Sequence, residues 1–340
     1  MMKRPGFNQI IIIVFYLTLC IFLVGFNLSK PRVLVIHSYD PDYSWVGDVN
    51  KGINEVLGKK PLSVKYFYLD IRRHPDTGYM TNAGIAARNL VNKWKPGVII
   101  AVDDEAQMLV GKYFVNHPSI NIVFAGVEGI LEEYGYDSAV NVTGIFEKIQ
   151  LDALRDTMVQ ILPEGRRRIA HISDASQPAL FSGGEINSYT WKPLELKDST
   201  RCRTFDDWKK AVLQAQDNAD ILLLTDYHSI RRSPTDKSIV PPREIIQWTE
   251  QNSRLPGISY REAYVEDGGM MAVCASPLEQ GRAAAEMALE IVEKGVKPLD
   301  IFFRENRLYI VHIRESGVKS HHITMPGMLE AFARATGHYY

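Results

Sequence analysis

Polar and aromatic side chains follow a short apolar run near the start of the chain, and these residue types can contact a ligand. The run VLVI at 33–36 is followed by His37, Ser38 and Tyr39, and then by Trp45. Histidine and serine can donate hydrogen bonds to ligand oxygens, and aromatic rings can stack on a ligand ring. The alternatives are ordinary ones: Trp45 packs beneath the helix that follows, and His37 makes its hydrogen bonds within the fold.

Acidic residues follow two later apolar runs. Asp103 and Asp104 come directly after the run at 98–102, and Glu128 comes just after Gly126. Carboxylates in a dry site attract an ammonium group and repel a ligand carboxylate. This pattern favours a cationic, amine-bearing or hydroxylated ligand. For the two aspartates the alternative is helix capping, because an acidic side chain can accept the free N–H groups of a first turn. Glu128 has the alternative of a solvated loop acid.

The second half of the chain repeats this arrangement. Polar residues follow the runs RIAHI and ILLL, and a tyrosine ends the run GISY where the chain is expected to recross between lobes. These candidates for ligand contact are Asp174, Ser176, Asp226, Tyr227 and Tyr260.

Motifs for catalysis, cofactors and metals are missing from the sequence. The chain contains no G-x-S-x-G, no P-loop, no G-x-G-x-x-G after a strand, and no zinc spacing. His37 and Ser38 are neighbours at a strand end, so their side chains should point to opposite sides and not form a catalytic pair. We therefore expect no enzyme, no cofactor and no metal site, with a hydrolase as the least favoured alternative.

The apolar periodicity predicts alternating strands and helices after residue 31. Short β-branched runs predict strands, and apolar residues at three- and four-residue steps predict helices between them. The expected strands are 33–36, 62–69, 98–102, 121–126, 168–172, 221–224, 257–260, 269–274 and 308–313. The expected helices include 45–57, 79–94, 151–161, 205–215, 243–252 and 277–294, and residues 127–144 are expected to be a crossing segment. This alternation predicts two doubly wound parallel-sheet lobes, in which ligands bind past the carboxyl ends of the strands.

The N-terminal segment differs from the rest of the chain. Lys3 and Arg4 precede the uncharged run at 10–26, whose seventeen residues would rise about 25 Å as a helix. An uncleaved membrane anchor is favoured because no clean A-x-A pattern precedes Lys30; a cleaved signal peptide and lipidation at Cys20 are the alternatives. All three place the remainder outside the cytoplasm, since the basic residues hold the N-terminus inside.

Composition narrows the class of protein further. The chain has 340 residues and a net charge of −1, so it suits two lobes and offers no basic surplus for nucleic acid. Besides Cys20, the cysteines are Cys202 and Cys274. Both are expected to be separate thiols, and a single disulfide is the alternative.

Several stretches together resemble a known family. VLVIHSYDPDYSWVGDVNKGI, GVIIAVDDEAQ, NIVFAGVEGI and GGMMAVCASPLEQGRAAAEMALEIVEKGVKPLDI are similar to substrate-binding proteins of ABC transporters of the tryptophan/tyrosine-type group. The resemblance covers about residues 32–335 and extends to the extracellular sensing domains of bacterial histidine kinases. Members of the group often have hydroxyl residues where this chain has Asp103 and Asp104.

The resemblance implies a type I periplasmic-binding-protein clamshell that closes on a small molecule. Lobe 1 is expected at 31–142 plus about 262–303, and lobe 2 at 143–261 plus about 304–340, after a membrane anchor or signal segment at 1–30. The implied function is solute binding for an ABC-type importer, with a membrane permease as partner. The alternative is a membrane-anchored sensing module for a separate signalling protein.

Overall fold

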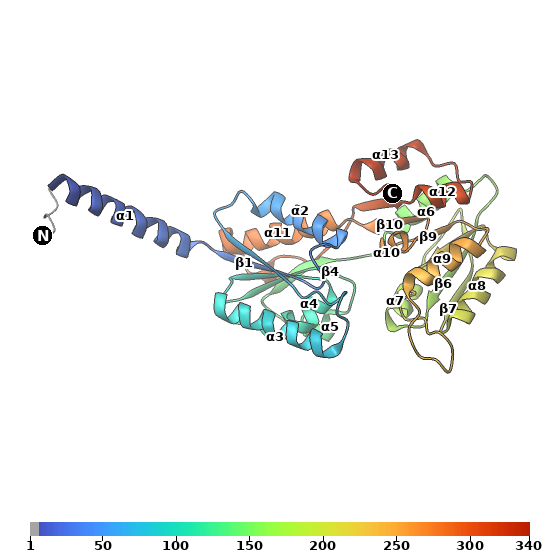
Figure 1. Ribbon diagram of the computed structural model, residues 1–340, viewed down its shortest axis with the longest axis horizontal. Helices are drawn as coiled ribbons and strands as arrows, with labels where there is room; N and C mark the ends of the chain where they lie inside the picture. Colours follow the sequence, from blue (N-terminus) through green and yellow to red (C-terminus); the bar gives the residue numbers. More distant parts are fainter. Residues whose placement is uncertain (1–6) are drawn as a thin grey trace, which may run out of the picture. The chain divides into compact units, whose positions relative to one another are not determined.

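The computed structural model describes residues 7–340 and divides the chain into two compact units (Figure 1). Unit 1 comprises the chain up to Glu147 together with Pro277–Glu305. Unit 2 comprises Lys148–Ser276 and Asn306–Tyr340. The chain therefore passes from one unit to the other three times.

Unit 1 is built on a sheet of six parallel strands in the order β11-β5-β4-β3-β1-β2. The strands are β1 (Arg32–His37), β2 (Ser63–Tyr68), β3 (Val98–Val102), β4 (Asn121–Val127), β5 (Val142–Phe146) and β11 (Arg304–Glu305). The central strand β3 is buried along its whole length. Such a continuous apolar run is what a parallel strand covered on both faces requires.

Helices cover both faces of this sheet, as Figure 1 shows. Val33 and Val35 of β1 pack with α2 (Ser44–Leu57) and α11 (Pro277–Lys294). Leu34 and Ile36 point the other way and pack with α3 (Thr77–Trp94). Because side chains alternate along a strand, one short run supplies two cores. The short helices α4 (Asp104–Leu109), η1 (Gly111–Phe114), α5 (Leu131–Tyr134) and η2 (Pro298–Asp300) complete the unit.

Helices α2 and α11 approach each other closely through glycines. A Cβ atom on Gly281 would lie 2.0 Å from the carbonyl oxygen of Val49, and one on Gly52 would lie 2.2 Å from the carbonyl oxygen of Leu278. Neither position has room for a side chain. Helix α11, which belongs to the last segment of unit 1 in the sequence, thus packs directly against α2, the helix that follows β1.

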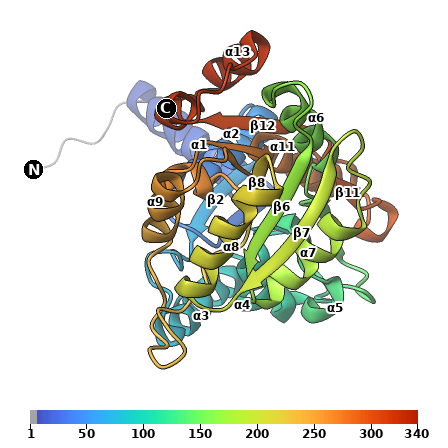
Figure 2. The same ribbon diagram turned by 90° about the vertical axis from the view of Figure 1, so that its right-hand side faces the viewer.

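Unit 2 repeats the plan with a sheet in the order β12-β10-β9-β8-β6-β7. The strands are β6 (Arg168–Asp174), β7 (Glu195–Cys202), β8 (Ile221–Leu224), β9 (Gly257–Ser259), β10 (Met271–Ala275) and β12 (Tyr309–Ile313). All pair in parallel except β10 with β12. The helices are α6 (Leu151–Ile161), α7 (Gln177–Ser188), α8 (Phe205–Asn218), α9 (Pro242–Asn252), α10 (Ala263–Glu266), α12 (Glu315–Ser320) and α13 (Gly327–Thr336), all labelled in Figure 1; Figure 2 shows unit 2 from the right-hand side of that view.

The predicted fold class is confirmed, with one antiparallel strand added at the edge of the second sheet. In both sheets the second strand in the sequence pairs with one edge of the first strand, and the third strand pairs with the opposite edge of that first strand. This reversal falls between β1 and β3 in unit 1 and between β6 and β8 in unit 2. Ligands of doubly wound sheets bind outside the carboxyl ends of the strands at such a point.

The unit boundaries differ from the expected ones. Residues 262–276 lie in unit 2, because β10 pairs with β9 and β12 there. Residues 143–147 lie in unit 1, because β5 extends its sheet beside β4, and the segment expected to cross between lobes is part of that unit. The elements that were not predicted include helix α7, strands β5, β7 and β11, and the short helices α5, α10 and α12.

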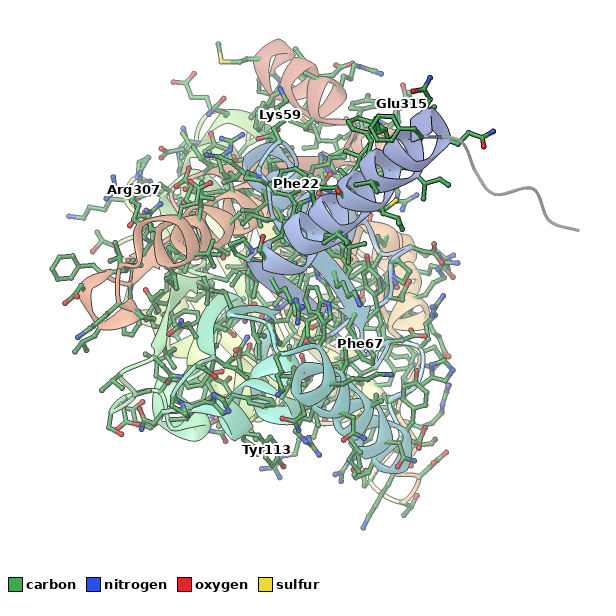
Figure 3. All side chains as sticks on the ribbon, turned by 90° about the vertical axis from the view of Figure 1, so that its left-hand side faces the viewer. Phe22, Lys59, Phe67, Tyr113, Arg307 and Glu315 are labelled. Atoms are coloured by element: carbon green, nitrogen blue, oxygen red, sulfur yellow. The ribbon has the colours of Figure 1, made fainter. Side chains whose placement is uncertain are left out.

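The apolar N-terminal segment forms the helix α1 (Phe7–Ser29). Its stretch Phe7–Asn27 is long and apolar enough to cross a membrane, and Phe22 is 66% exposed on it (Figure 3). A signal sequence has the same properties. Cys202 and Cys274 are buried and are not joined by a disulfide, as the sequence predicted, and Cys20 is exposed on α1.

Candidate functional site

Ser38 joins three elements at the carboxyl end of the unit 1 sheet. Its hydroxyl donates to the carbonyl oxygen of Val102 at 2.9 Å and accepts from the backbone N–H of Ala106 at 2.9 Å. The side chain is fully buried. Ser38 therefore satisfies a free N–H in the first turn of α4 and fastens the end of β1 to the end of β3.

Trp45, Asp103 and Gly126 meet beside this junction. The indole N–H of Trp45 donates to Oδ1 of Asp103 at 3.0 Å, with both side chains buried. Asp103 has φ of 67° and its side chain makes no capping hydrogen bond to α4. Gly126 has φ of 63°, and a Cβ there would lie 2.9 Å from Asp103 Oδ1, so a side chain at this position would be strained. The capping alternative for Asp103 is wrong because its backbone turns the carboxylate toward α2 and away from the helix.

Asp104 fastens the loop that follows β4. Its carboxylate accepts from the hydroxyl of Tyr134 and from the backbone N–H groups of Glu128 and Gly129, the latter at 3.1 Å. These are loop contacts, so Asp104 does not cap α4 either. Burial raises the pKa of Asp104, and the negative charge of Glu128 raises it further.

A third acid, Glu105, lies next to this loop. Burial raises the pKa of Glu105, and the charges of Asp104 and Glu128 add to the rise. Tyr39 partly offsets it through a hydrogen bond to the Glu105 carboxylate. Glu128 is exposed. Unit 1 thus brings carboxylates together at the carboxyl ends of β3 and β4, where a positively charged group would be stabilised.

His37 and Tyr39, at the end of β1, contact different partners. The His37 Nε2 atom lies 2.8 Å from Oδ1 of Asn50 on α2, and its ring stacks on Tyr68 at 5.4 Å. Burial lowers the pKa of His37 to about 4, although the hydrogen bond to Asn50 opposes this, so the ring is neutral at pH 7. His37 and Ser38 point to opposite faces, as the strand alternation predicted. The Tyr39 ring instead contacts Tyr43 edge to face, with ring centroids 5.5 Å apart.

Asp226 is the centre of the polar cluster in unit 2. It follows β8, is 7% exposed, and accepts from the hydroxyls of Ser182 at 2.7 Å and Tyr260 at 3.1 Å. Arg261 forms an ion pair with Oδ1 at 3.2 Å. Burial on its own would raise the pKa of Asp226, but the charge of Arg261 and the two hydroxyl donors outweigh it, and the pKa lies below its ordinary value.

The other predicted residues of unit 2 mainly hold loops. Asp174 accepts from the backbone N–H groups of Ser176 and Ser229 at 2.9 and 2.8 Å, and is 1% exposed. Ser176 caps α7 by accepting from the backbone N–H of Ala179. Tyr227 is fully buried and donates to Asp267 at 2.8 Å. These contacts fix the strand ends that carry Asp226.

Three polar residues of these clusters were not predicted from the sequence. Ser182 comes from α7, a helix without a clear apolar stripe, and Arg261 directly follows Tyr260. Gln280 of α11 accepts from the backbone N–H of Gly126 at 2.9 Å and donates to the carbonyl oxygen of Phe146 at 3.0 Å. Arg261 could have been predicted by the rule that selected Asp226, because it also follows a strand. Ser182 and Gln280 come from helices, and a rule based on strand ends does not select helical residues.

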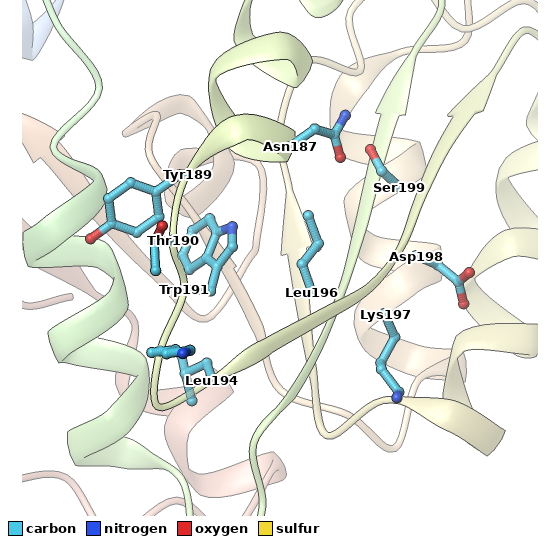
Figure 4. Close-up of a pocket in the computed structure, with 10 residues that line it drawn as sticks. Asn187, Tyr189, Thr190, Trp191, Leu194, Leu196, Lys197, Asp198 and Ser199 are labelled. Carbon is cyan, nitrogen blue, oxygen red and sulfur yellow. The ribbon is translucent and has the colours of Figure 1, made fainter.

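A cavity of about 460 Å³ lies elsewhere in unit 2, between the end of α7 and the edge strand β7 (Figure 4). Tyr189, Trp191 and Leu196 line it together with polar residues of β7. None of the predicted ligand contacts lines this cavity. Within residues 7–340, no group of three or more acidic, histidine or cysteine side chains is arranged to hold a metal ion.

The polar clusters around Asp103 in unit 1 and Asp226 in unit 2 lie past the carboxyl ends of strands, the edge at which doubly wound sheets bind ligands. Residues 78–336 match the family model described as ABC transporter substrate binding protein. The chain belongs to this family. No curated protein matches the sequence.

Solved structures of substrate-binding proteins share the fold of this family member. A ligand-free, open substrate-binding protein with adhesive properties from Clostridium difficile has a TM-score of 0.66 and 12% identity, covering 87% of this chain and 96% of that one. An ABC domain in complex with L-Trp from Streptococcus pneumonia has a TM-score of 0.61 and 16% identity, covering 89% and 98%. A leucine-binding protein from Thermotoga maritima has a TM-score of 0.56 and 14% identity, covering 84% and 96%.

Family membership settles the general class of the protein. The family and fold are those of ligand-binding proteins that act outside the cytoplasm on small molecules, and they are not those of enzymes. The resemblance noted from the sequence is therefore confirmed at the level of the family and the type I fold.

Proposed function

We propose that this substrate-binding protein delivers a small amine-bearing solute to an ABC-type importer. The ligand would contact the polar cluster at the carboxyl ends of the unit 1 strands, where the predicted contacts supply negative charge. The observation that carries this ligand class is the group of acids at the carboxyl ends of β3 and β4: Asp103, Asp104, Glu105 and Glu128.

The acids of this group differ in the groups that they already contact. Asp103 is buried and accepts from the indole N–H of Trp45, which is a neutral donor. Asp104 is engaged by Tyr134 and a backbone loop. A ligand ammonium would supply positive charge that these contacts do not provide, and a ligand carboxylate would be repelled. In unit 2, by contrast, Asp226 already has the Arg261 guanidinium.

A ligand panel tests the proposal. The full chain in detergent is heated with amino acids, amines, sugars and nucleosides, and a ligand at 100 times its dissociation constant adds about 2.7 kcal/mol to stability. We expect amine-bearing compounds to raise the melting temperature. A panel in which only sugars or anionic compounds do so would refute the ligand class.

Matched variants locate the charge. Asp103→Asn keeps an oxygen to accept from Trp45 while removing the charge, and should weaken amine binding about tenfold or more, because a buried charge partner contributes about 1.5–3 kcal/mol. Asp137→Asn removes an exposed acid before β5 and should leave binding unchanged. Amine binding should also weaken as the pH falls, because the pKa values of Asp104 and Glu105 are raised and both acids lose charge earlier than usual.

A second candidate function is a membrane-anchored sensing module. Helix α1 is separated from the first strand of unit 1 by only Lys30 and Pro31, a short connection suited to holding the protein at a membrane partner. A permease and ATPase encoded beside this chain would support transport, and a kinase or cyclase in their place would support sensing.

A further inference from the structure

The amino ends of the unit 1 strands form a basic surface. We define the amino-end face as residues 29–32, 58–62, 93–97, 115–121, 137–141 and 293–303, which lead into the strands of this sheet. Eight basic residues lie in these segments: Lys30, Arg32, Lys59, Lys60, Lys93, Lys95, Lys294 and Lys297. Three acids accompany them: Asp137, Glu293 and Asp300. Six of the eight basic side chains are exposed, including Lys59, which is labelled in Figure 3.

The opposite edge of the same sheet has the reverse charge. Segments 38–43, 69–76, 103–105 and 128–133, together with Glu147, follow the strands and contain Arg72 and Arg73 as their basic residues. Their acids are Asp40, Asp42, Asp70, Asp76, Asp103, Asp104, Glu105, Glu128, Glu132, Glu133 and Glu147. Unit 1 is therefore polarised along its strands, although the whole chain carries a net charge of −1.

Apolar side chains are exposed among the lysines of the amino-end face. Phe302 is 92% exposed, Leu299 68% and Val140 57%. They precede β11 and β5, which are neighbours in the sheet. Exposed basic and apolar residues on one surface are typical of proteins that lie on anionic bilayers, because lysines attract the headgroups and apolar side chains enter the interface.

The chain connection brings this face to a membrane. Helix α1 ends at Ser29 and β1 begins at Arg32, and three peptide units reach about 10 Å at most. The headgroup layer of one leaflet is about 5–8 Å thick. If α1 spans the bilayer, the amino end of β1 lies at or just above the headgroups, on the same edge of the sheet as the lysines.

We propose that the amino-end face of unit 1 binds the surface of an anionic membrane while α1 remains in the bilayer. This orientation directs the acidic carboxyl ends of the strands away from the lipid. The proposal rests on retention of α1 and is independent of which ligand the protein binds.

Energy transfer to labelled lipid headgroups tests this orientation. The full chain carrying Cys20→Ser, whose remaining cysteines are buried, is reconstituted into phosphatidylcholine vesicles with or without 30% phosphatidylglycerol. A fluorophore is attached at Ser119→Cys on the amino-end face or at Thr77→Cys at the start of α3, both exposed positions. We expect stronger transfer from position 119 than from position 77, and an increase at 119 when phosphatidylglycerol is present. Salt at about 1 M, where the screening length is about 3 Å, should abolish the increase.

Neutralising the face provides the second measurement. Each lysine near an anionic surface changes binding about fivefold, so four substitutions should lower the ratio of bound to free orientation at least tenfold. The test set is Lys59→Gln, Lys60→Gln, Lys95→Gln and Lys297→Gln, and the control set in unit 2 is Lys197→Gln, Lys210→Gln, Lys237→Gln and Lys319→Gln. The control set should have no effect. Equal transfer from both labels, indifference to phosphatidylglycerol, or a mature chain that lacks α1 by mass spectrometry would each overturn the proposal. A ligand panel without hits would leave it intact.

Discussion

Substitution of Gly281 by alanine is expected to destabilise unit 1 by forcing two helices apart. The added Cβ would lie 2.0 Å from the Val49 carbonyl oxygen, whereas real Cβ atoms essentially never come within 3.0 Å of a heavy atom. Helices α2 and α11 must therefore separate locally by about 1 Å. The obstacle is backbone, so no side-chain rotation relieves it.

The cost follows from overpacking in a close-packed core. Such substitutions cost about 1–3 kcal/mol, and the rigid obstacle places this one near 3 kcal/mol. For a unit of this size that corresponds to a fall of about 6–12 °C in melting temperature. Gly52→Ala should behave similarly, because its Cβ would lie 2.2 Å from the Leu278 carbonyl oxygen.

Gly47→Ala is the matched control on the same helix. A Cβ at Gly47 meets nothing within 4 Å, so the substitution should stabilise α2 by about 0.5–1 kcal/mol. The assay is thermal and urea unfolding of the full chain in detergent. If Gly281→Ala melted within 1 °C of the wild type, the close contact between α2 and α11 would be refuted.

Three further predictions concern the polar clusters. Trp45→Phe keeps the ring but removes the hydrogen bond to Asp103, so urea titration should show a loss of about 1.5–3 kcal/mol. Asp226→Asn removes the negative charge that pairs with Arg261 and should cost about 1.5–3 kcal/mol at pH 7. Because the folded-state pKa of Asp226 is lowered, the free energy of unfolding of the wild type should fall as the pH falls through that lowered pKa, and that of the variant should not. The measurement is urea unfolding of both proteins between pH 3 and 7. The same dependence of stability on pH in the wild type and the variant would contradict this prediction. His37 has a folded-state pKa of about 4 against 6.5 when unfolded, so stability should fall by up to about 3 kcal/mol between pH 6.5 and 4, and His37→Gln should flatten that slope in the same titration.

The regular strands and helices were predictable because their burial leaves a periodic record. Strand β3 is buried at every position and α2 buries one stripe, and both patterns are readable in the sequence. Strand β7 is an edge strand with most residues exposed, so it has neither alternation nor a continuous apolar run. Helix α7 contains serines, glycines and one proline in place of an apolar stripe. Both elements were missed for these physical reasons.

The candidate site was predictable in its location but less so in its contacts. The rule that ligands bind past the carboxyl ends of strands selected Asp103 and Asp226, and the structure places them after β3 and β8. The direction of a carboxylate depends on backbone torsions and distant partners, however. The positive φ of Asp103 directs its side chain to Trp45 and leaves the first turn of α4 to Ser38, which comes from another strand. The spacing of residues along the sequence does not indicate that Ser38, and not Asp103, binds the first turn of α4.

The interrupted course of unit 1 has a consequence for how the protein is made. Helix α11 is synthesised long after α2, β1 and β3, and it covers their apolar surfaces only once residues 277–294 have emerged. The nascent N-terminal half therefore lacks the piece that completes its core and should stay loosely structured during synthesis. Such delayed completion suits a polypeptide that must be threaded through a translocation pore before it matures. A premature stop codon shortly before residue 277 would therefore remove α11 and leave the core of unit 1 incomplete, although most of the residues of unit 2 would already have been made.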